Sequence, residues 1–309
     1  GDLVSYGDSA AAVTIDLNLK GPQSGGDAQG DELINIASVS GSAFHDTITV
    51  NGGYAFGTGG KDQLYGGSVS DALIGGDSND RLFGGGGDDL LAGDSRDPFA
   101  PSGSETNEDE LYGGNGNDFL IGGVGADLLN GGSGDDVYYM VDSEDVIRDA
   151  GGIDTVITNM ESYALDKQLE NLVFDDNGAP INHVGTGSAG NNLMIGGSAN
   201  DTLFAGAGSD TLNGGDGDDV LADLVGHDTI VFSDGTDTAI GFGAAGKTEQ
   251  DIIDLSNRGF ASLDDFYAQG GTIVQVGKDT QIHLYDDGPT LILQGVSVDS
   301  IDDSDFYFG

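Results

Sequence analysis

The sequence contains no cysteine, and only nine of its 309 residues are Lys or Arg. Without cysteine, the chain can form neither a disulfide framework nor a thiolate zinc site. Nucleic acid is an unsuitable partner, because binding it requires Lys and Arg to neutralise phosphates. We therefore expect a protein that is held together by something other than disulfides and that does not bind nucleic acid.

Signals for membrane insertion are also absent. No run of about 18 apolar residues occurs, and no basic region followed by an apolar region follows Gly1. The sequence thus predicts neither a membrane span nor an N-terminal secretory signal. Because the chain starts with Gly rather than Met, we expect it to be part of a longer one.

Common catalytic motifs are missing as well. The chain has no HExxH, and its four histidines (His45, His183, His227 and His283) are scattered singly, which argues against a metalloprotease. It has no GxSxG, which argues against a lipase. A carboxylate pair for glycoside chemistry stays open, because a chain this rich in Asp offers many unspecific pairs.

Glycine and aspartate are present in large excess. The chain has 56 Gly, and its 54 acidic residues, 46 of them Asp, give a formal charge of −45. Without a collagen triplet, that much glycine indicates turns. Such an acidic chain could be solvated or disordered, but regular spacing of the aspartates would instead favour a cation site.

That regular spacing is clearest between Gly113 and Tyr139. The segment reads GGNGNDFLI, GGVGADLLN and GGSGDDVYY, three nine-residue units with Gly at positions one, two and four and Asp at position six. The glycines permit tight turns with positive φ, and the residues after each Asp form a three-residue strand. The middle residues of these strands, Leu120, Leu129 and Tyr138, are the predicted core. A period of nine is typical of a calcium-binding parallel β-solenoid.

These units resemble those of the RTX (repeats-in-toxin) family of secreted calcium-binding proteins. The resemblance implies that two units make one coil and that each calcium ion lies between turns eighteen residues apart. Ions would then lie between the Asp109 and Asp127 turns and between the Asp118 and Asp136 turns. Carboxylates and carbonyls at about 2.3 to 2.6 Å are suitable ligands for this hard cation.

The same period divides the chain into five segments. We expect an all-β fold, a parallel β-roll in two repeat blocks, with these segments: a strand-rich N-terminal cap (1–56), a first block (57–140) with an inserted loop (93–103), a strand-rich spacer (141–186), a second block (187–231) and a C-terminal β cap (232–309). The acidic and then apolar end of the cap resembles the terminus of proteins exported by type I secretion, although it could equally be an edge strand.

The predicted calcium ligands are the sixth residues of the units and the glycines that shape the turns. They are Asp62, Asp71, Asp80, Asp89, Asp109, Asp118, Asp127, Asp136, Asn192, Asp201, Asp210, Asp219 and Asp228, with Gly85, Gly87, Gly114, Gly116, Gly123, Gly125, Gly132, Gly134, Gly197, Gly206, Gly208, Gly215 and Gly217. About seven or more Ca²⁺ ions are expected. The sites at Val69 and Ser78, which lack Gly at position four, and at Asn192, which lacks the charge, are expected to be weaker.

Function follows from calcium and from the resemblance. We expect an extracellular or cell-surface module without catalytic residues that folds on binding calcium after type I secretion. Its partners would be calcium and the secretion machinery, and its role folding, export, surface assembly or adhesion. The alternative is the noncatalytic appendage of a secreted enzyme that acts on an extracellular polysaccharide, such as an alginate epimerase or lyase, which would make the chain part of a larger enzyme.

Overall fold

The computed structural model describes residues 2–94, 107–139, 142–222, 225–244, 250–285 and 288–309. From residue 95 on, the predicted inserted loop (93–103) lies outside these residues. Contacts divide the chain into two compact units, Gly1–Ile157 and Thr158–Gly309. Both consist mainly of stacked parallel strands, which confirms the predicted all-β roll.

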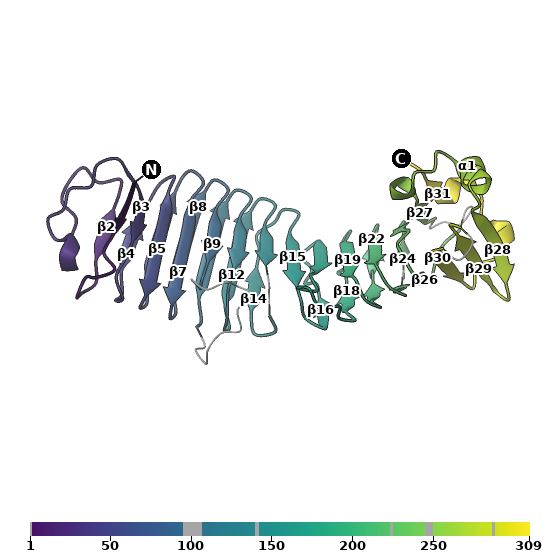
Figure 1. The fold of residues 1–309 in the computed structure, drawn as a ribbon, viewed down its shortest axis with the longest axis horizontal. Coiled ribbons are helices and arrows are strands. Elements are labelled where there is room, and N and C mark those ends of the chain that lie inside the picture. Colours follow the sequence, from purple (N-terminus) through teal and green to yellow (C-terminus); the bar gives the residue numbers. More distant parts are fainter. Residues whose placement is uncertain (1, 95–106, 140–141, 223–224, 245–249, 286–287) are drawn as a thin grey trace. The chain divides into compact units, whose positions relative to one another are not determined.

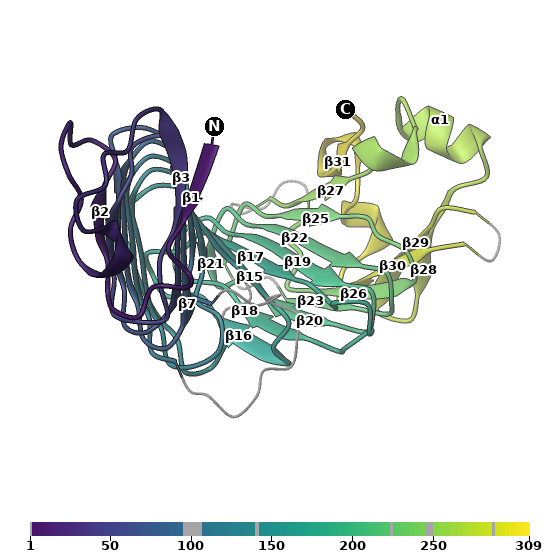
Figure 2. The same cartoon turned by 60° about the vertical axis from the view of Figure 1, so that its left-hand side comes forward.

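In the first unit, successive strands alternate between two parallel sheets, so that each pair of strands completes one coil (Figure 1). One sheet contains β1 (Asp2–Ser5), β3 (Ile36–Ser40), β5 (Tyr54–Gly59), β7 (Ala72–Asp77), β9 (Leu90–Ala92), β11 (Phe119–Ile121), β13 (Val137–Tyr139) and β15 (Thr155–Thr158). The other contains β2 (Thr14–Asp16), β4 (Thr47–Thr49), β6 (Gln63–Gly67), β8 (Arg81–Gly86), β10 (Glu110–Asn115), β12 (Leu128–Ser133) and β14 (Val146–Arg148). The view in Figure 2 shows these coils one behind another.

The strand register follows the eighteen-residue period. Leu111 pairs with Leu129, and Leu120 pairs with Tyr138, in each case eighteen residues later. Between β8 and β10 the offset is 29 residues, from Leu82 to Leu111. Since 29 is eighteen plus eleven, one coil contains the eleven residues predicted as an insertion.

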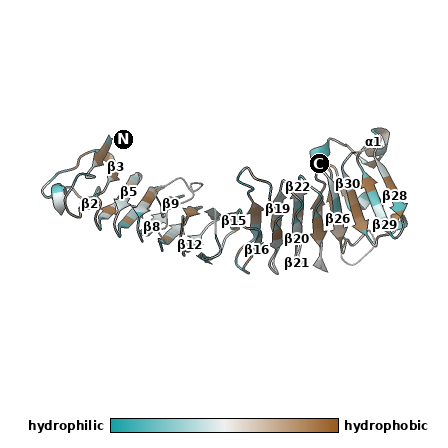
Figure 3. Cartoon of the chain, turned by 60° about the horizontal axis from the view of Figure 1, so that its bottom comes forward, coloured by the Kyte–Doolittle hydropathy of each residue, from teal (hydrophilic) through white to brown (hydrophobic). Residues whose placement is uncertain are grey.

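The core is a stack of apolar side chains from the middle of each strand. Leu120, Leu129 and Tyr138 are fully buried, as expected from the alternation of side chains along a strand. Each buried leucine contributes about 1.5 to 3 kcal/mol relative to an exposed one. Hydrophobic residues are accordingly concentrated on the strands (Figure 3).

The second unit repeats this plan with a different end. One sheet contains β17 (Asn171–Phe174), β19 (Leu193–Gly197), β22 (Thr211–Gly215), β25 (Thr229–Val231), β27 (Ile252–Asp254) and β31 (Phe306–Tyr307). The other contains β16 (Ser162–Ala164), β18 (Val184–Thr186), β20 (Thr202–Phe204), β23 (Val220–Ala222), β26 (Thr236–Ile240), β30 (Thr290–Gln294), β29 (Asp279–His283) and β28 (Thr272–Val276). A small sheet pairs β21 (Ala207–Gly208) with β24 (Val225–Gly226).

The last residues of this unit depart from the roll. Strands β28, β29 and β30 are antiparallel, and β31 pairs with β27 as an edge strand. The helix α1 (Leu263–Ala268) was not predicted. Ser262 caps it by accepting the amide N–H of Asp265, and Phe266 anchors it in the core. Short 3-10 turns occupy Gly26–Ala28, Ser256–Arg258, Val298–Ser300 and Asp303–Asp305.

The segment predicted as a spacer also consists of strands. Residues 142–186 contain β14 and β15, which belong to the first unit apart from Thr158, and β16, β17 and β18 of the second. Tyr138 of β13 pairs with Val156 of β15, again eighteen residues later. The coil geometry therefore extends past the last glycine-rich unit.

Candidate metal centre

Each sixth-position aspartate lies where a turn passes into a strand. Asp118 directly precedes β11, and its carbonyl oxygen accepts the N–H of Val137 in the next coil at 2.8 Å. Its own N–H donates to Oδ1 of Asp136, the equivalent residue of that coil, at 2.7 Å. Each aspartate side chain is thus fixed against the backbone of the preceding coil.

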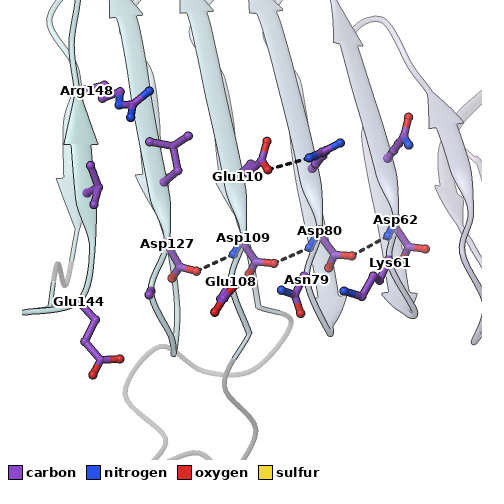
Figure 4. Close-up of a pocket in the computed structure, with 15 residues that line it drawn as sticks. Lys61, Asp62, Asn79, Asp80, Glu108, Asp109, Glu110, Asp127, Glu144 and Arg148 are labelled. Atoms are coloured by element: carbon purple, nitrogen blue, oxygen red, sulfur yellow. Dashed lines mark hydrogen bonds and ion pairs between the residues drawn. The ribbon is translucent and has the colours of Figure 1, made fainter.

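This contact repeats along both edges of each unit and forms what we call aspartate ladders. The N···O distances range from 2.6 to 3.1 Å. In the first unit, one ladder runs through Asp46, Asp62, Asp80, Asp109, Asp127 and Asp145, and the other through Asp71, Asp89, Asp118, Asp136 and Asp154. In the second unit, one ladder runs through His183, Asp201, Asp219 and Asp237, and the other through Asn192, Asp210, Asp228 and Asp251. Figure 4 shows the row from Asp62 to Asp127.

The second carboxylate oxygen, Oδ2, has no hydrogen-bond partner in twelve of these aspartates, although it is buried. They are Asp62, Asp71, Asp80, Asp89, Asp109, Asp118, Asp127, Asp136, Asp201, Asp210, Asp219 and Asp228. These are the twelve aspartates predicted as calcium ligands. An ionised carboxylate that is buried without a partner is strongly unfavourable, so each of these oxygens requires a proton or a cation.

A recess at the first glycine of each turn places these oxygens beside backbone carbonyls. A Cβ atom built on Gly113 would lie 2.2 Å from Oδ2 of Asp118 and 2.6 Å from the carbonyl oxygen of Gly131, one coil further. On Gly57 it would lie 2.2 Å from Oδ2 of Asp62 and 2.4 Å from the carbonyl oxygen of Gly75. Any side chain would occupy the space that these oxygens border, which explains why the position is glycine.

The pKa values of the ladder carboxyls reflect this burial. Desolvation raises the pKa of Asp80 to about 9, and the charges of Asp109 and Asp62 contribute to the shift. It raises the pKa of Asp109 to about 8 and that of Asp127 to about 7. Without a cation, these groups hold protons near neutral pH, and a cation would have to displace those protons.

At the C-terminal ends of three ladders, a protein group donates a hydrogen bond to Oδ2 of the last aspartate. Oδ2 of Asp145 accepts the N–H of Asp142 at 2.9 Å, and Oδ2 of Asp237 accepts the hydroxyl of Ser233 at 2.7 Å. Oδ2 of Asp251 likewise accepts the N–H of Gly243, at 2.6 Å. At these ends, the protein's own donors take the place that a cation would take in the interior of the ladder.

Asn192 begins one ladder of the second unit with an amide. Its Nδ2 donates to the carbonyl oxygen of Glu170 at 2.9 Å, and its Oδ1 accepts the N–H of Ser188 at 2.7 Å. Both ends of the amide are therefore occupied by protein groups. The structure gives Asn192 the role of closing the ladder, whereas the sequence predicted a weaker calcium ligand.

Six ladder residues lay outside the predicted site: Asp46 and His183 at N-terminal ends, and Asp145, Asp154, Asp237 and Asp251 at C-terminal ends. Asp145, Asp154 and Asp237 each stand eighteen residues after a predicted ligand, so continuing the count would have found them. Because the units that contain these three residues lack the full glycine pattern, the sequence indicates strands there and no calcium ligands. Asp251 follows Asp228 at an offset of 23 residues, and no regular signal in the sequence indicates it.

The predicted glycines adopt the conformation that only glycine adopts readily. All of them have positive φ, from 99° at Gly206 to 154° at Gly208. Ser78 replaces a glycine and still has a φ of 81°, whereas Val69 at the equivalent position is not in the left-handed region. In the turn that contains Val69, Oδ1 of Asp71 accepts two backbone N–H groups of the preceding coil, those of Gly52 and Gly53.

The donor set fits a hard divalent cation. Each turn offers a carboxylate oxygen with no partner, and the adjacent coil offers a backbone carbonyl; both are the ligand types that Ca²⁺ prefers. The ladder residues that would hold such ions are the twelve aspartates named above. Bound calcium would supply the positive charge that the rows of carboxylates lack.

One comparison, with a family of calcium-binding repeats, agrees with this chemistry. The RTX calcium-binding nonapeptide repeat matches four segments, residues 56–91, 106–138, 186–221 and 208–239. No curated protein matches the chain. Among solved structures, the chain is similar to the extracellular lipase LipA from Serratia marcescens, with 15% identity and a TM-score of 0.25 over 86% of this chain and 45% of that one. The chain thus spans less than half the length of that lipase. Among the described residues, no helix has the length and apolar character needed to cross a membrane.

RTX nonapeptide repeats bind calcium, and their four copies fall on the ladders that lack a cation partner. The chain therefore contains repeats of the RTX calcium-binding nonapeptide type in four segments.

Proposed function

We propose that this chain is a noncatalytic extracellular module that folds when it binds calcium. The observation that carries the proposal is the set of twelve buried Oδ2 atoms without a hydrogen-bond partner. They make the folded state costly without a cation and favourable with one. Calcium therefore acts here as a condition for the fold, as a structural metal does in other small domains.

The energetics support a switch between the inside and the outside of a cell. For a Kd of about 10⁻⁴ M and about 1 mM calcium, each site adds RT ln(1 + [L]/Kd), or about 1.4 kcal/mol. About seven sites then contribute on the order of 10 kcal/mol, which equals the whole stability of a typical domain. Below about 1 μM calcium, the same expression gives almost nothing.

Secretion and surface roles extend this proposal. An unfolded, strongly acidic chain with a formal charge of −45 suits passage through a type I secretion channel. Folding outside, where calcium is abundant, would prevent its return. The folded module then serves export, surface assembly or adhesion.

A groove supports a second candidate, the noncatalytic appendage of a polysaccharide-acting enzyme. Lys61, Arg81 and Arg148, three of the nine basic residues, line one groove of about 600 Å³ (Figure 4). Arg81 is paired with Glu110 at 2.8 Å, which leaves Lys61 and Arg148 as the other two basic residues of the groove. Seven carboxylate residues line the same groove, so an acidic glycan would bind there only with calcium ions on those carboxylates. Binding of alginate that is lost in the double variant Lys61→Gln/Arg148→Gln would favour this candidate.

A calcium titration followed by circular dichroism tests the main proposal. We expect a largely unfolded spectrum after calcium removal and a cooperative gain of β-structure on adding calcium, with Mg²⁺ much less effective because it demands octahedral geometry. The variant Asp109→Asn, which removes one buried ligand, should require more calcium. Asp135→Asn, which changes an exposed neighbour of the ladder by the same charge, is the control. A protein that is fully β-structured at neutral pH without calcium would contradict the proposal.

A further inference from the structure

One outer sheet face of the first unit carries no charged residue. In β3, β5, β7, β9, β11 and β13, the residue at the middle of each paired segment is fully buried, so the residues before and after it face outward. These outward residues are Ser38, Ser40, Tyr54, Phe56, Ala72, Ile74, Leu90, Ala92, Phe119, Ile121, Val137 and Tyr139. We call them the β7–β9 face. Charged residues make up 20% of the chain, so six neighbouring strands without one form an unusual surface.

The outer face of the opposite sheet differs in this respect. Its equivalent positions include Arg81, Glu110 and Arg148, on β8, β10 and β14. On the β7–β9 face, by contrast, hydrophobic side chains are exposed: Tyr54 by 55% and Leu90 by 38%. An exposed apolar surface with a polar border is typical of a site of protein association.

The distribution of charge indicates what covers this face. The exposed Asp88 and Asp135 border it, and the chain has a formal charge of −45, so copies of the chain repel one another over most of their surface. At the β7–β9 face, two copies can meet without bringing carboxylates into direct contact. A basic partner would instead be attracted by the carboxylates and would gain nothing from a face without charge. The charge pattern therefore favours a second copy of the chain.

The relief of the face also fits a second copy. In the sheet, Ala72 of β7 pairs with Leu90 of β9, and Ile74 pairs with Ala92, so the two strands carry a small and a large side chain in opposite order. A two-fold axis parallel to the strands and midway between β7 and β9 would place Leu90 of one copy over Ala72 of the other, and Ile74 over Ala92. Ala72 is only 8% exposed, so it forms a notch beside the projecting Leu90.

The same axis brings the next strands into matching pairs. It places β5 of one copy opposite β11 of the other, with the aromatic ring of Tyr54 over that of Phe119. It places β3 opposite β13, with the small Ser40 over the large Tyr139. The strands of both copies have the same spacing of about 4.8 Å, so these contacts stay in step along the face.

We propose that the β7–β9 face is an interface between two copies of this chain, packed sheet against sheet about this two-fold axis. The strands of the two copies run parallel, and their stacks of coils run in opposite directions. Six strands of three residues cover roughly 300 Å² in projection. That is at the low end of protein interfaces, so we expect a reversible dimer with a Kd above about 1 μM. The proposal names a partner for surface assembly and rests on the proposed function only because the chain must first fold in calcium.

Sedimentation equilibrium of the full chain in calcium tests the interface. At chain concentrations from about 5 to about 500 μM, we expect a monomer–dimer equilibrium. Added NaCl should strengthen the dimer, because it screens the repulsion between two acidic copies and leaves apolar contacts in place. A dimer held by charged contacts would weaken instead, which would contradict an uncharged interface.

The deciding variants exchange the projecting side chain and the notch. Leu90→Ala should raise the dimer Kd at least tenfold, and Ala72→Leu should do the same because two leucines then collide. The double variant Ala72→Leu/Leu90→Ala should dimerise like the parent, since the axis places residue 72 of one copy over residue 90 of the other. Leu128→Ala, at the equivalent position of the opposite sheet, is the matched control and should leave the Kd unchanged. If Ala72→Leu does not fold in calcium, the exposed Tyr54→Ser replaces it as the second weakening variant.

The outcomes separate the interface from the calcium-dependent fold. A parent that is β-structured in calcium and monomeric at every concentration overturns the interface, as does a dimer that Leu90→Ala does not weaken. A folded double variant that stays monomeric overturns the two-fold arrangement. Each of these results leaves calcium-dependent folding untouched, because circular dichroism measures it separately. A parent that is fully β-structured at neutral pH without calcium would overturn the proposed function instead.

Discussion

Lowering the pH should stabilise the calcium-free chain. Asp80 and Asp109 have pKa values of about 9 and about 8 in the folded chain, chiefly because burial disfavours the charged carboxylate. In the unfolded chain they titrate near the ordinary value of about 3.9. A carboxyl whose pKa is higher when folded binds more protons in the folded state. The free energy of unfolding is therefore highest in acid and falls as the pH rises through the folded values.

The magnitude follows from these two residues alone. Between pH 5 and 7, each is protonated when folded and ionised when unfolded, so each lowers the free energy of unfolding by about 1.4 kcal/mol per pH unit. Two carboxyls over two pH units give a loss of about 5 to 6 kcal/mol. Domains typically have only about 5 to 15 kcal/mol in total, so the loss is enough to unfold a marginal chain.

Thermal denaturation of metal-free protein between pH 5 and 7 provides the assay. This range lies above the isoelectric point of about 4.1, so the chain keeps its negative charge. We expect the metal-free chain to melt at the highest temperature at pH 5 and at lower temperatures as the pH rises, until it is largely unfolded near pH 7. The double variant Asp80→Asn/Asp109→Asn should flatten this slope. In ample calcium the slope should disappear, because calcium binds the ionised carboxylates and both the folded and the unfolded chain are then ionised in this range. A metal-free melting temperature that is constant or rises from pH 5 to 7 would refute the reasoning.

Two further predictions concern single turns. Gly132→Ala places a Cβ 2.2 Å from the carbonyl oxygen of Gly114 at a φ of 109°, whereas Gly151→Ala has a φ of 134° and no atom within 4 Å. Both variants have backbone strain of about 1 to 3 kcal/mol, and only Gly132→Ala adds a steric clash. Gly132→Ala should therefore raise the calcium concentration needed for folding more than Gly151→Ala does. Equal effects in a calcium titration would contradict the close approach of the two coils. Asn192→Asp removes the amide donor to Glu170 and adds a buried carboxylate, so the variant should bind one more calcium ion in equilibrium dialysis and need more calcium to fold; an unchanged stoichiometry would count against the ladder geometry.

Much of the roll could be predicted because each nine-residue unit contains the residues that determine its own turn and strand. In the unit that begins at Gly113, glycines supply the positive φ, Asp118 ends the turn, and Leu120 enters the core. None of these requirements depends on residues far away in the sequence. The stacking partner also follows from the count, because the equivalent residue lies eighteen positions later, as Leu120 and Tyr138 do.

What lies outside the glycine-rich units could be predicted less well. Helix α1 depends on Ser262 as a cap and on a core position for Phe266, which no repeat pattern announces. Asp145 and Asp154 complete ladders from units almost without the glycine pattern, because a strand register can persist after the residues that started it have changed. A prediction based on the glycine pattern alone therefore leaves out the last aspartates of the ladders.

The ends of the ladders determine where calcium is required. Within a ladder, Oδ1 of each aspartate accepts an N–H of the preceding coil, and no protein donor reaches Oδ2. Each coil in the interior of a ladder therefore requires a cation. A ladder can end in two ways. A protein donor can satisfy the last oxygen, as Ser233 does for Asp237 and as the amide of Asn192 does at the other end. Alternatively, the last aspartate can lie beside further carboxylates, as Asp154 does, one oxygen each of Asp136, Asp149 and Asp154 lying within 4.8 Å of the other two.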